Sequence, residues 1–294
     1  MEFNGQFVTG KVSDVNDDTV FVQFAGITMP VNMTEFETKV PELGASVTGF
    51  AYEDEHHNPR MTTRKPKISE SQYAYCDVVA TRRDLGVFVD AGLEEKDIAV
   101  SLDQLPLEGY LWPQRGDRLM VKLSIDKKNR MWAVIADGNI INQLSRRAHA
   151  DMKNKDVTAT VYRNKIVGTF VFTDEHQLGF IHPNERDREP RLGEVIHGRV
   201  IGVRDDGGLN ISLKPRAFEA IDDDAGMVLA VLEHSRDGRL NLTDKSAPEE
   251  IKRKLDISKG AFKRAVGHLL KARRITLHEG YIELVPGESE ENAE

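Results

Sequence analysis

The chain has 294 residues, of which 39% are hydrophobic and 30% charged, as is ordinary for a globular protein of two or three domains, or of more if they are small. Its single cysteine, Cys76, is expected in a strand core and excludes an intramolecular disulfide, and no apolar run approaches the roughly 20 residues that span a bilayer. The net charge of −8 excludes a uniformly basic nucleic-acid binder, so any binding face has to be local.

The first residues do not show the basic start and following apolar run of a signal peptide. Together with the single cysteine and the lack of an apolar span, this predicts a cytoplasmic protein that does not associate with membranes.

The pattern up to about residue 135 is mostly β. Short runs rich in Val, Phe and Thr alternate with polar residues and are separated by Gly, Asp and Asn, which is typical of small antiparallel sheets. The predicted strands cover residues 6–13, 19–24, 45–52, 75–81, 85–90, 118–125 and 132–135.

Three segments resemble one another and indicate a repeated unit. Each has a strand, a polar break, a second strand in which Phe precedes Val, and later a strand that follows a glycine. The phenylalanines are Phe21, Phe88 and Phe170, and the glycines are Gly44, Gly116 and Gly193. Five strands in roughly 60–75 residues is the size of an oligonucleotide-binding (OB) barrel. We therefore predict three such barrels, at 1–66, 70–138 and 155–215.

The remaining segments are predicted to be helical or tail-like. A linker helix is expected at 139–154, and the sequence becomes largely helical after Pro215. Helix, strand, two helices and a hairpin follow, which is the order of a winged helix-turn-helix domain, at 217–286. The glutamates of 287–294 predict a disordered acidic tail. The predicted fold class is therefore multidomain and mainly β, with an α+β domain at the C-terminal end.

Alternation orients the aromatic residues of the third unit. If Val171 fills the barrel, then Phe170 and Phe172 stand on its outer face. Rings in that position can stack on bases, which contributes about 1–3 kcal/mol per base and tolerates any base. His182 alternates with Ile181 and is expected to face outward as well. The alternative is that these residues have only a structural role, as a Phe in a barrel strand often does.

The third unit resembles the S1-type RNA-binding domains, a subset of OB folds. The matching segments begin at Gly168 (Gly-x-Phe-Val), at Gly179 (Gly-Phe-Ile-His) and at Gly193. The resemblance implies that Phe170 and His182 contact single-stranded RNA, together with a charged pair before the last strand. In that pair Asp205 can stand for the acid, whereas Leu209 and Asn210 fall where the base would lie.

The other two units keep only some of the residues that carry the resemblance to S1-type domains. The second unit has its aromatic residue at Phe88 and has Ser101 in place of the histidine, and it reproduces the charged pair as Asp126 and Arg130. The first unit keeps Phe21 but lacks the glycine and the histidine, so we expect it to bind least.

The last predicted helix, 258–274, segregates basic charge, because it contains six Lys and Arg residues and no Asp or Glu. Such a helix suits contact with phosphates. The expected contacts are Lys259, Lys263, Arg264, Lys271 and Arg274. The alternatives are a solvated helix face and a domain that serves only for packing or protein interaction.

The whole order resembles the conserved virulence factor B family of bacterial RNA-binding regulators, over nearly the entire chain. This implies a cytoplasmic regulator of gene expression that binds single-stranded RNA, with DNA as a second partner. We expect a monomer without cofactor or metal; the best metal candidate is His56-His57 after Glu53-Asp54-Glu55.

Three other functions compete with this one. S1 units often accompany ribonucleases, but no clustered carboxylates, phosphate loop, nucleophile triad or zinc spacing appears, so we predict no enzyme. The winged helix alone would suit a DNA-binding transcription regulator. A translation or ribosome-associated factor is the third alternative.

Overall fold

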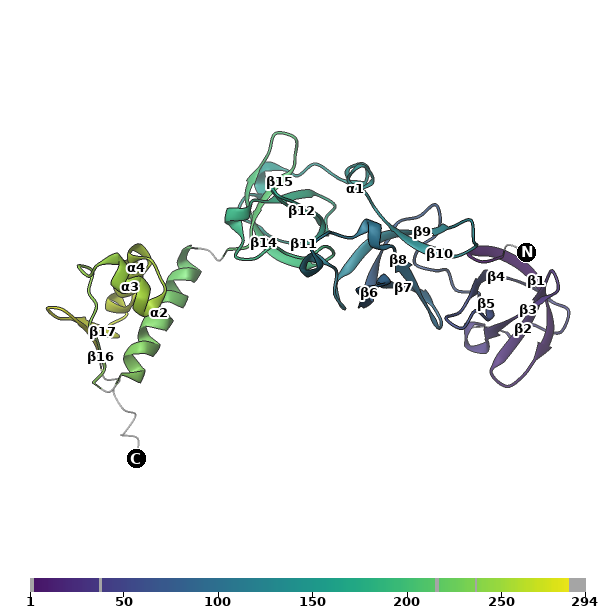
Figure 1. Ribbon diagram of the computed structural model, residues 1–294, viewed down its shortest axis with the longest axis horizontal. Coiled ribbons are helices and arrows are strands. Elements are labelled where there is room, and N and C mark those ends of the chain that lie inside the picture. The colour runs from purple at the N-terminus through teal and green to yellow at the C-terminus, as the bar shows by residue number, and fades with distance from the viewer. Residues whose placement is uncertain (1–2, 37–38, 215–216, 236, 286–294) are drawn as a thin grey trace, which may run out of the picture. The chain divides into compact units, whose positions relative to one another are not determined.

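The computed structural model describes residues 3–36, 39–214, 217–235 and 237–285. The chain divides into two compact units, Met1–Lys214 and Pro215–Glu294. The first contains three five-stranded barrels, coloured purple, blue and green in Figure 1. The predicted fold class, mainly β with an α+β winged helix at the C-terminal end, is confirmed. The predicted acidic tail lies outside the described residues.

The three barrels share one strand order. The first consists of β1 (Gln6–Val15), β2 (Thr19–Phe24), β3 (Ile27–Asn32), β4 (Ser46–Glu53) and β5 (Pro59–Thr62). The second consists of β6 (Ala74–Arg82), β7 (Gly86–Leu93), β8 (Lys96–Val100), β9 (Arg118–Ile125) and β10 (Met131–Ile135). The third consists of β11 (Asp156–Lys165), β12 (Gly168–Thr173), β13 (Leu178–Ile181), β14 (Val195–Val203) and β15 (Leu209–Ser212).

Closure differs between the barrels. Parallel pairing of the third strand with the fifth closes the second and third barrels, through β8 with β10 and β13 with β15. In the first barrel β3 and β5 are the two edges of a curved sheet, which is nearly closed.

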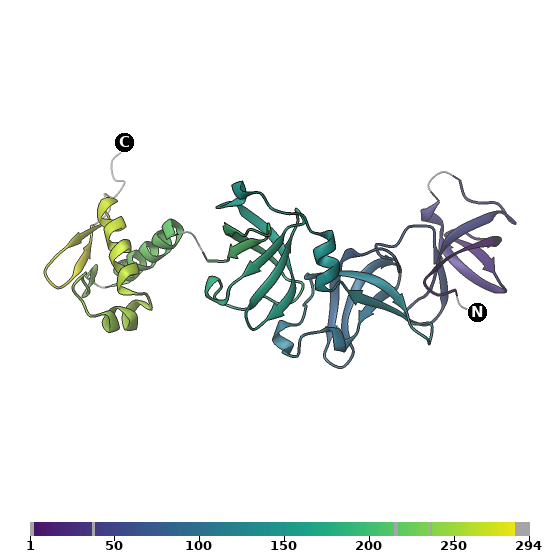
Figure 2. The ribbon, with the colours of Figure 1, turned by 90° about the horizontal axis from the view of Figure 1, so that it is seen from above.

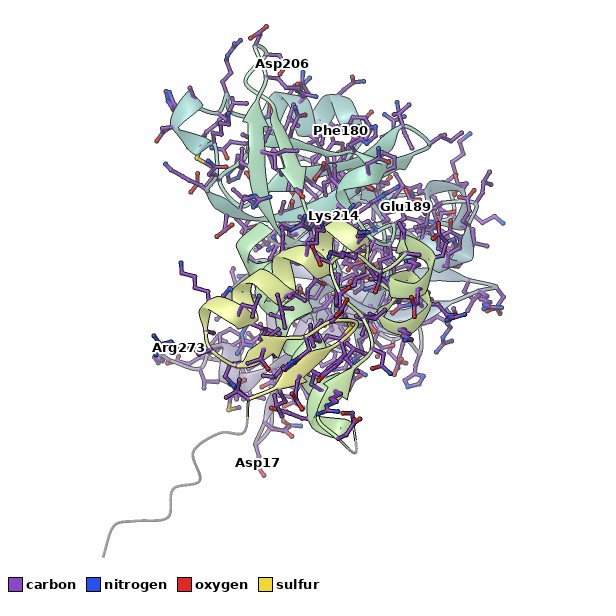
Figure 3. All side chains as sticks on the ribbon, turned by 90° about the vertical axis from the view of Figure 1, so that its left-hand side faces the viewer. Asp17, Phe180, Glu189, Asp206, Lys214 and Arg273 are labelled. Carbon is purple, nitrogen blue, oxygen red and sulfur yellow. The ribbon has the colours of Figure 1, made fainter. Side chains whose placement is uncertain are left out.

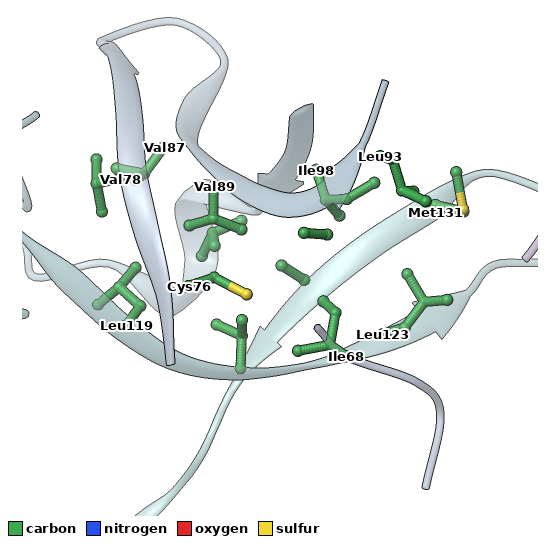
Figure 4. Close-up of a cluster of buried hydrophobic side chains, with 14 of the residues drawn as sticks. Ile68, Cys76, Val78, Val87, Val89, Leu93, Ile98, Leu119, Leu123 and Met131 are labelled. Atoms are coloured by element: carbon green, nitrogen blue, oxygen red, sulfur yellow. The ribbon is translucent and has the colours of Figure 1, made fainter. Parts of the chain in front are cut away.

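Alternating apolar side chains fill each barrel. In the second barrel the valines of β7, Val87 and Val89, point inward together with Ile98 of β8 (Figure 4). Cys76 lies in the same core, as predicted, and burial raises the pKa of its thiol to about 11. This cysteine is therefore a small apolar residue of the core.

Every barrel has a β-bulge at the same place, where its first strand meets its second. The register shifts between Val12 and Asp14, between Val78 and Ala80, and between Val161 and Arg163. One extra residue therefore stands on the outside of the barrel beside the Phe of the second strand. This extra residue is Ser13 in the first barrel, Val79 in the second and Tyr162 in the third.

The segment between the second and third barrels contains a shorter helix than predicted. The helix α1 (Gly138–Leu144) is capped by the Asp137 carboxylate and lies at the junction of the two barrels (Figures 1 and 2). The prediction of a helix over 139–154 was wrong because Ser145 is extended and Arg146 pairs with the third barrel, where its N–H donates to the His176 carbonyl at 2.7 Å.

Polar and apolar contacts hold the second and third barrels together. The guanidinium of Arg191 donates two hydrogen bonds of 3.0 Å to the carboxylate of Asp117, which is buried. Arg118 lies over the ring of Tyr75 and donates to Thr160 and Asp174 of the third barrel. Leu192, although it precedes β14, belongs to the core of the second barrel.

The second barrel also contacts the first barrel, on the side away from the third. Phe50 and Tyr52 of β4 belong to the core of the second barrel, and the Tyr52 hydroxyl donates to the Glu94 carbonyl at 3.0 Å. The buried Asn4 side chain donates to the carbonyl of Asn129 at 2.7 Å, in the turn between β9 and β10.

The second unit contains α2 (Ala217–His234), β16 (Arg239–Leu240), α3 (Pro248–Leu255), α4 (Lys259–Lys271), β17 (Ile275–Leu277) and β18 (Ile282–Leu284). The strands form one sheet in the order β16-β18-β17. Phe262, Ala265 and Leu269 of α4 pack in the core of this unit. Among the described residues of the chain, no helix is long and apolar enough to cross a membrane.

Candidate nucleic-acid interface

Three aromatic rings stand in contact on the outside of the third barrel. Phe170 of β12 is paired across the sheet with Phe180 of β13, and their rings meet edge to face at 5.3 Å between centroids. The ring of Tyr162 lies 6.3 Å from that of Phe170. None of the three belongs to the barrel core, which is filled by Val171 and its neighbours. We call Tyr162, Phe170 and Phe180 the aromatic row of the third barrel; Figure 3 labels Phe180.

A glycine and a bulge explain how the row forms. Gly168 has φ +148°, and a Cβ at this position would lie 2.6 Å from the Phe180 ring and 2.5 Å from the Ile181 carbonyl oxygen. Only glycine therefore lets β12 pair with β13 at this point while the Phe180 ring lies against the backbone of residue 168. Tyr162 is the extra residue of the bulge, which places its ring beside that of Phe170.

Phe172 does not present an exposed ring. The predicted alternation is correct, since Phe172 lies outside the barrel core, but the side chain is 1% exposed because Ala136 and Ile141 cover it. Phe172 therefore fastens α1 to the third barrel, and the expectation of a free stacking surface at this residue was wrong.

His182 faces solvent at the end of β13, as predicted. Its Nδ1 accepts a hydrogen bond of 3.1 Å from the N–H of Asn184, so Nε2 is the ring nitrogen left to face a ligand. In the second barrel Ser101 holds the same place before a short 3-10 turn.

The charged pair of the third barrel is present in reversed order. Asp206, and not Asp205, accepts hydrogen bonds from the N–H of Gly208 at 2.8 Å and from Nε of Arg204 at 3.2 Å. The hydrogen bond of the Gly208 N–H is the main cause that lowers the pKa of Asp206. Leu209 and Asn210 lie in β15, where the base was expected, and the basic partner is Arg204, which precedes the acid instead of following it.

The second barrel has a row of different composition. Phe88 of β7 is paired with Ala99 of β8, and Ala99 is in turn paired with Trp132 of β10. All three side chains alternate with buried residues, so they face outward. We call Phe88, Ala99 and Trp132 the aromatic row of the second barrel; its two rings are separated by a methyl group.

The predicted pair Asp126 and Arg130 lies at one end of this row. The Asp126 carboxylate accepts hydrogen bonds from the Arg130 N–H at 2.9 Å, from Arg130 Nε at 2.8 Å and from Trp132 Nε1 at 3.1 Å. The backbone and side chain of Arg130 lower the pKa of Asp126. The pair thus holds the Trp132 ring in place.

Cations lie over the rings of both rows. Lys165 Nζ is 5.6 Å from the Phe170 centroid, and the guanidinium of Arg82 is 5.6 Å from the Phe88 centroid. The Arg130 guanidinium lies 5.3 Å from the Trp132 ring. Positive charge is therefore concentrated beside the rings in a chain of net charge −8, which places cations where a phosphate backbone would follow stacked bases.

The described residues of the first barrel form no comparable surface around Phe21. Phe21 is paired with Pro30 on one side and Asp14 on the other. The carboxylate of Asp14 beside the ring opposes a phosphate, so this face is the least suited of the three to nucleic acid.

The predicted phosphate contacts of the last helix fall into two groups, and Arg274 lies beyond α4, which ends at Lys271 and not at 274 as predicted. Lys259 donates to the Ser246 carbonyl at 2.8 Å, and Arg274 pairs with Glu233 at 3.4 Å, so both are engaged within the unit. The exposed residues Lys263, Arg264 and Lys271 pair with no acidic side chain in the part of the chain that the structure describes. These three are the better candidates for phosphate contact.

The described residues contain no group of three or more His, Cys, Asp or Glu side chains placed to hold a metal. His56 and His57 are exposed in the turn between β4 and β5; His56 lies beside Glu55 of the same turn, and His57 lies beside Glu53 at the end of β4.

Sequence reasoning missed Tyr162, Phe180, Trp132 and Arg204 as site residues. Alternation could have found two of them, since Phe180 lies two residues before His182, and Trp132 two after Arg130. Tyr162 faces outward only because of the bulge, and Arg204 required the turn geometry.

Family models match four consecutive parts of the chain. An S1 domain matches residues 4–64, the CvfB first S1-like domain matches 73–134, the second domain of the virulence regulatory factor CvfB matches 141–215, and the CvfB-like winged helix domain matches 226–284.

Similar proteins cover most of the chain. The uncharacterized protein YitL of Bacillus subtilis is 38% identical over 94% of this chain and 92% of its own. Conserved virulence factor B of Staphylococcus aureus is 38% identical over 83% of this chain and 80% of its own. A crystal structure of a multidomain protein with nucleic acid binding domains from Streptococcus pneumoniae shares 44% identity and a TM-score of 0.69, over 96% of this chain and 98% of that one. The chain belongs to the conserved virulence factor B family.

Proposed function

We propose that this protein is a cytoplasmic regulator of bacterial gene expression that binds single-stranded RNA through its barrels and uses α4 as an accessory phosphate contact. The observation that carries the proposal is the row of the third barrel, where Tyr162, Phe170 and Phe180 offer contiguous rings with Lys165 above one of them. A duplex keeps its bases stacked inside, whereas a single strand can place its bases on such rings.

The relatives support a nucleic-acid ligand and a regulatory role. The Streptococcus pneumoniae protein is described as having nucleic acid binding domains, and a matching family model is named for a virulence regulatory factor. None of the four matching family descriptions names a catalytic activity. Binding rather than catalysis is therefore the function that we assign.

A second candidate is duplex DNA bound by the winged helix. It is favoured by the exposed Lys263, Arg264 and Lys271 on α4, the helix that corresponds to a recognition helix in such domains. Because phosphate contacts alone carry no sequence information, α4 fits an accessory role on RNA equally well.

Titration with labelled single-stranded RNA, single-stranded DNA and duplex DNA at several salt concentrations separates the two candidates. We expect the tightest binding to single-stranded RNA, with an affinity that falls as salt rises. Tight duplex-DNA binding with negligible affinity for RNA would refute the proposed function.

A further inference from the structure

A hollow of about 460 Å³ lies where the second barrel, α1 and the third barrel meet. Its volume is within the range of roughly 300–1,000 Å³ that is typical of ligand sites. The lining residues are Gln104, Ile135, Ala136, Asp137, Gly138, Asn139, Tyr162 and Arg163. We propose that this hollow, the junction pocket, receives one unstacked base of an RNA strand and reads its hydrogen-bonding edge. The inference rests on the RNA binding proposed above and adds base selection to it.

The junction pocket is continuous with the aromatic row of the third barrel. Tyr162 lines the pocket and is also the first ring of the row of the third barrel, 6.3 Å from Phe170. Ile135, on the other side of the pocket, packs against the core of the second barrel, whereas Trp132, three residues earlier on β10, faces outward. A strand stacked on the row of the third barrel therefore meets the pocket at the Tyr162 end of that row.

Contacts across the junction keep this pocket in one shape. Arg191 and Asp117 join the two barrels, and Phe172 packs against Ala136, which lines the pocket, and against Ile141 of α1. Side chains on both sides are thus held at fixed separation, which a site needs if it is to distinguish one base from another.

The chemistry of the lining suits a base edge better than a phosphate. The side-chain oxygen of Gln104 accepts the N–H of Ile135 at 2.8 Å, which leaves its NH₂ group as a donor. Asn139 is exposed and offers both a donor and an acceptor. Asp137 already caps α1 by accepting the N–H groups of Asn139 and Ile140 at 2.9 Å.

Arg163 supplies the cation of the pocket. Its guanidinium lies beside Gly138, and no described acidic side chain pairs with it. Burial raises the pKa of the Tyr162 phenol, and the positive charge of the nearby Arg163 offsets part of this increase. Amides and a guanidinium are the groups that discriminate bases, whereas stacked rings accept any base. The rows thus supply affinity, and the junction pocket supplies selectivity.

The test compares three labelled RNA decamers, A10, C10 and U10, on the full-length protein. The quantity of interest is the ratio between the largest and the smallest Kd of the three. In the variant Asn139→Ala/Arg163→Gln we expect this ratio to fall by about fivefold or more, since hydrogen bonds to the preferred base are lost. Phe170→Ala should weaken binding to all three decamers by similar factors and leave the ratio unchanged.

Two further variants keep the result interpretable. Arg115→Gln removes an exposed arginine that does not line the pocket, and it should leave the ratio unchanged. Gln104→Glu keeps the acceptor for the Ile135 N–H and removes the donor, so it should lower the ratio even if the double variant folds poorly.

The outcomes separate the two proposals. An unchanged ratio in folded pocket variants, or a wild type that binds RNA with equal affinity for the three decamers, overturns the junction pocket and leaves RNA binding in place. A wild type that binds none of the decamers overturns the proposed function and the pocket with it.

Discussion

The second and third barrels have the same strands, the same bulge and the same parallel closure, but they carry different side chains on their outer faces. In the third barrel Tyr162, Phe170 and Phe180 form a contiguous row of rings. In the second barrel Ala99 interrupts the row between Phe88 and Trp132. The difference teaches that the fold supplies positions and that each barrel's share of binding depends on the residues that occupy them.

The charged pairs of the two barrels show the same principle. Asp126 precedes Arg130 in the second barrel, whereas Arg204 precedes Asp206 in the third. Both turns let the carboxylate accept backbone N–H groups. The turn conformation is thus kept while the order of the two charges is exchanged.

The largest expected effect concerns the contact that joins the two barrels. Asp117→Ala removes both hydrogen bonds of the Arg191 guanidinium to Asp117 and leaves the Gln114 N–H without its acceptor, while Arg191 keeps only the longer ion pair with Glu194 at 3.6 Å. Because the site is largely buried, we expect a loss of about 2–4 kcal/mol in the free energy of unfolding. Urea denaturation of the full chain measures it. The exposed Asp103→Ala is the control, and equal losses in both variants would show that the contact does not stabilise the junction.

The next effect concerns Phe180, the ring that stands where the second barrel has Ala99. Phe180→Ala should weaken binding of single-stranded RNA by about tenfold, because one stacking surface is lost. Fluorescence anisotropy with a labelled decamer measures the affinity. Phe7→Ala, at an exposed Phe of the first barrel, is the matched control, and an equal loss there would contradict a specific role for the row.

A substitution that adds the missing ring to the second barrel tests the same comparison through a gain in affinity. Ala99→Phe would complete the row of the second barrel, and we expect about threefold tighter RNA binding from the added stacking surface. The control is Thr48→Phe, which adds a ring at an exposed position of β4 in the first barrel. Weaker or unchanged binding in Ala99→Phe would mean that the second row does not contact RNA.

The smallest effect at physiological salt is expected in the second unit. Replacing Lys263 and Arg264 with Gln should flatten the slope of log affinity against log salt by about 1.4, at roughly 0.7 per phosphate contact on a single strand. The exposed pair Lys245 and Arg253 provides the control substitutions. A slope equal to that of the wild type would assign α4 to packing.

Much of the fold followed from the sequence because period-two alternation and repeated Phe-Val pairs are local signals. The outward orientation of Phe170 and the inward one of Val171 needed nothing else. The extent of α1 was overestimated, because the extended backbone after Leu144 depends on pairing with the third barrel, which is a tertiary contact.

The candidate site was predicted in part. Asp126 and Arg130 pair with each other, and Phe88 faces outward on the same barrel, but the cover over Phe172 comes from α1 and from Ala136 and is not encoded in its own strand. Tyr162 faces outward because of a bulge, and a bulge shifts the alternation by one residue without a clear sequence mark. The junction pocket joins segments far apart in the chain, so no local pattern could indicate it.

The most direct test of the central claim is the affinity of wild type, Phe170→Ala and Phe21→Ala for one labelled single-stranded RNA decamer. We expect Phe170→Ala to lose about tenfold or more, and Phe21→Ala less than about twofold, because only Phe170 belongs to a contiguous row with a cation above it. Equal losses in the two variants would contradict the account.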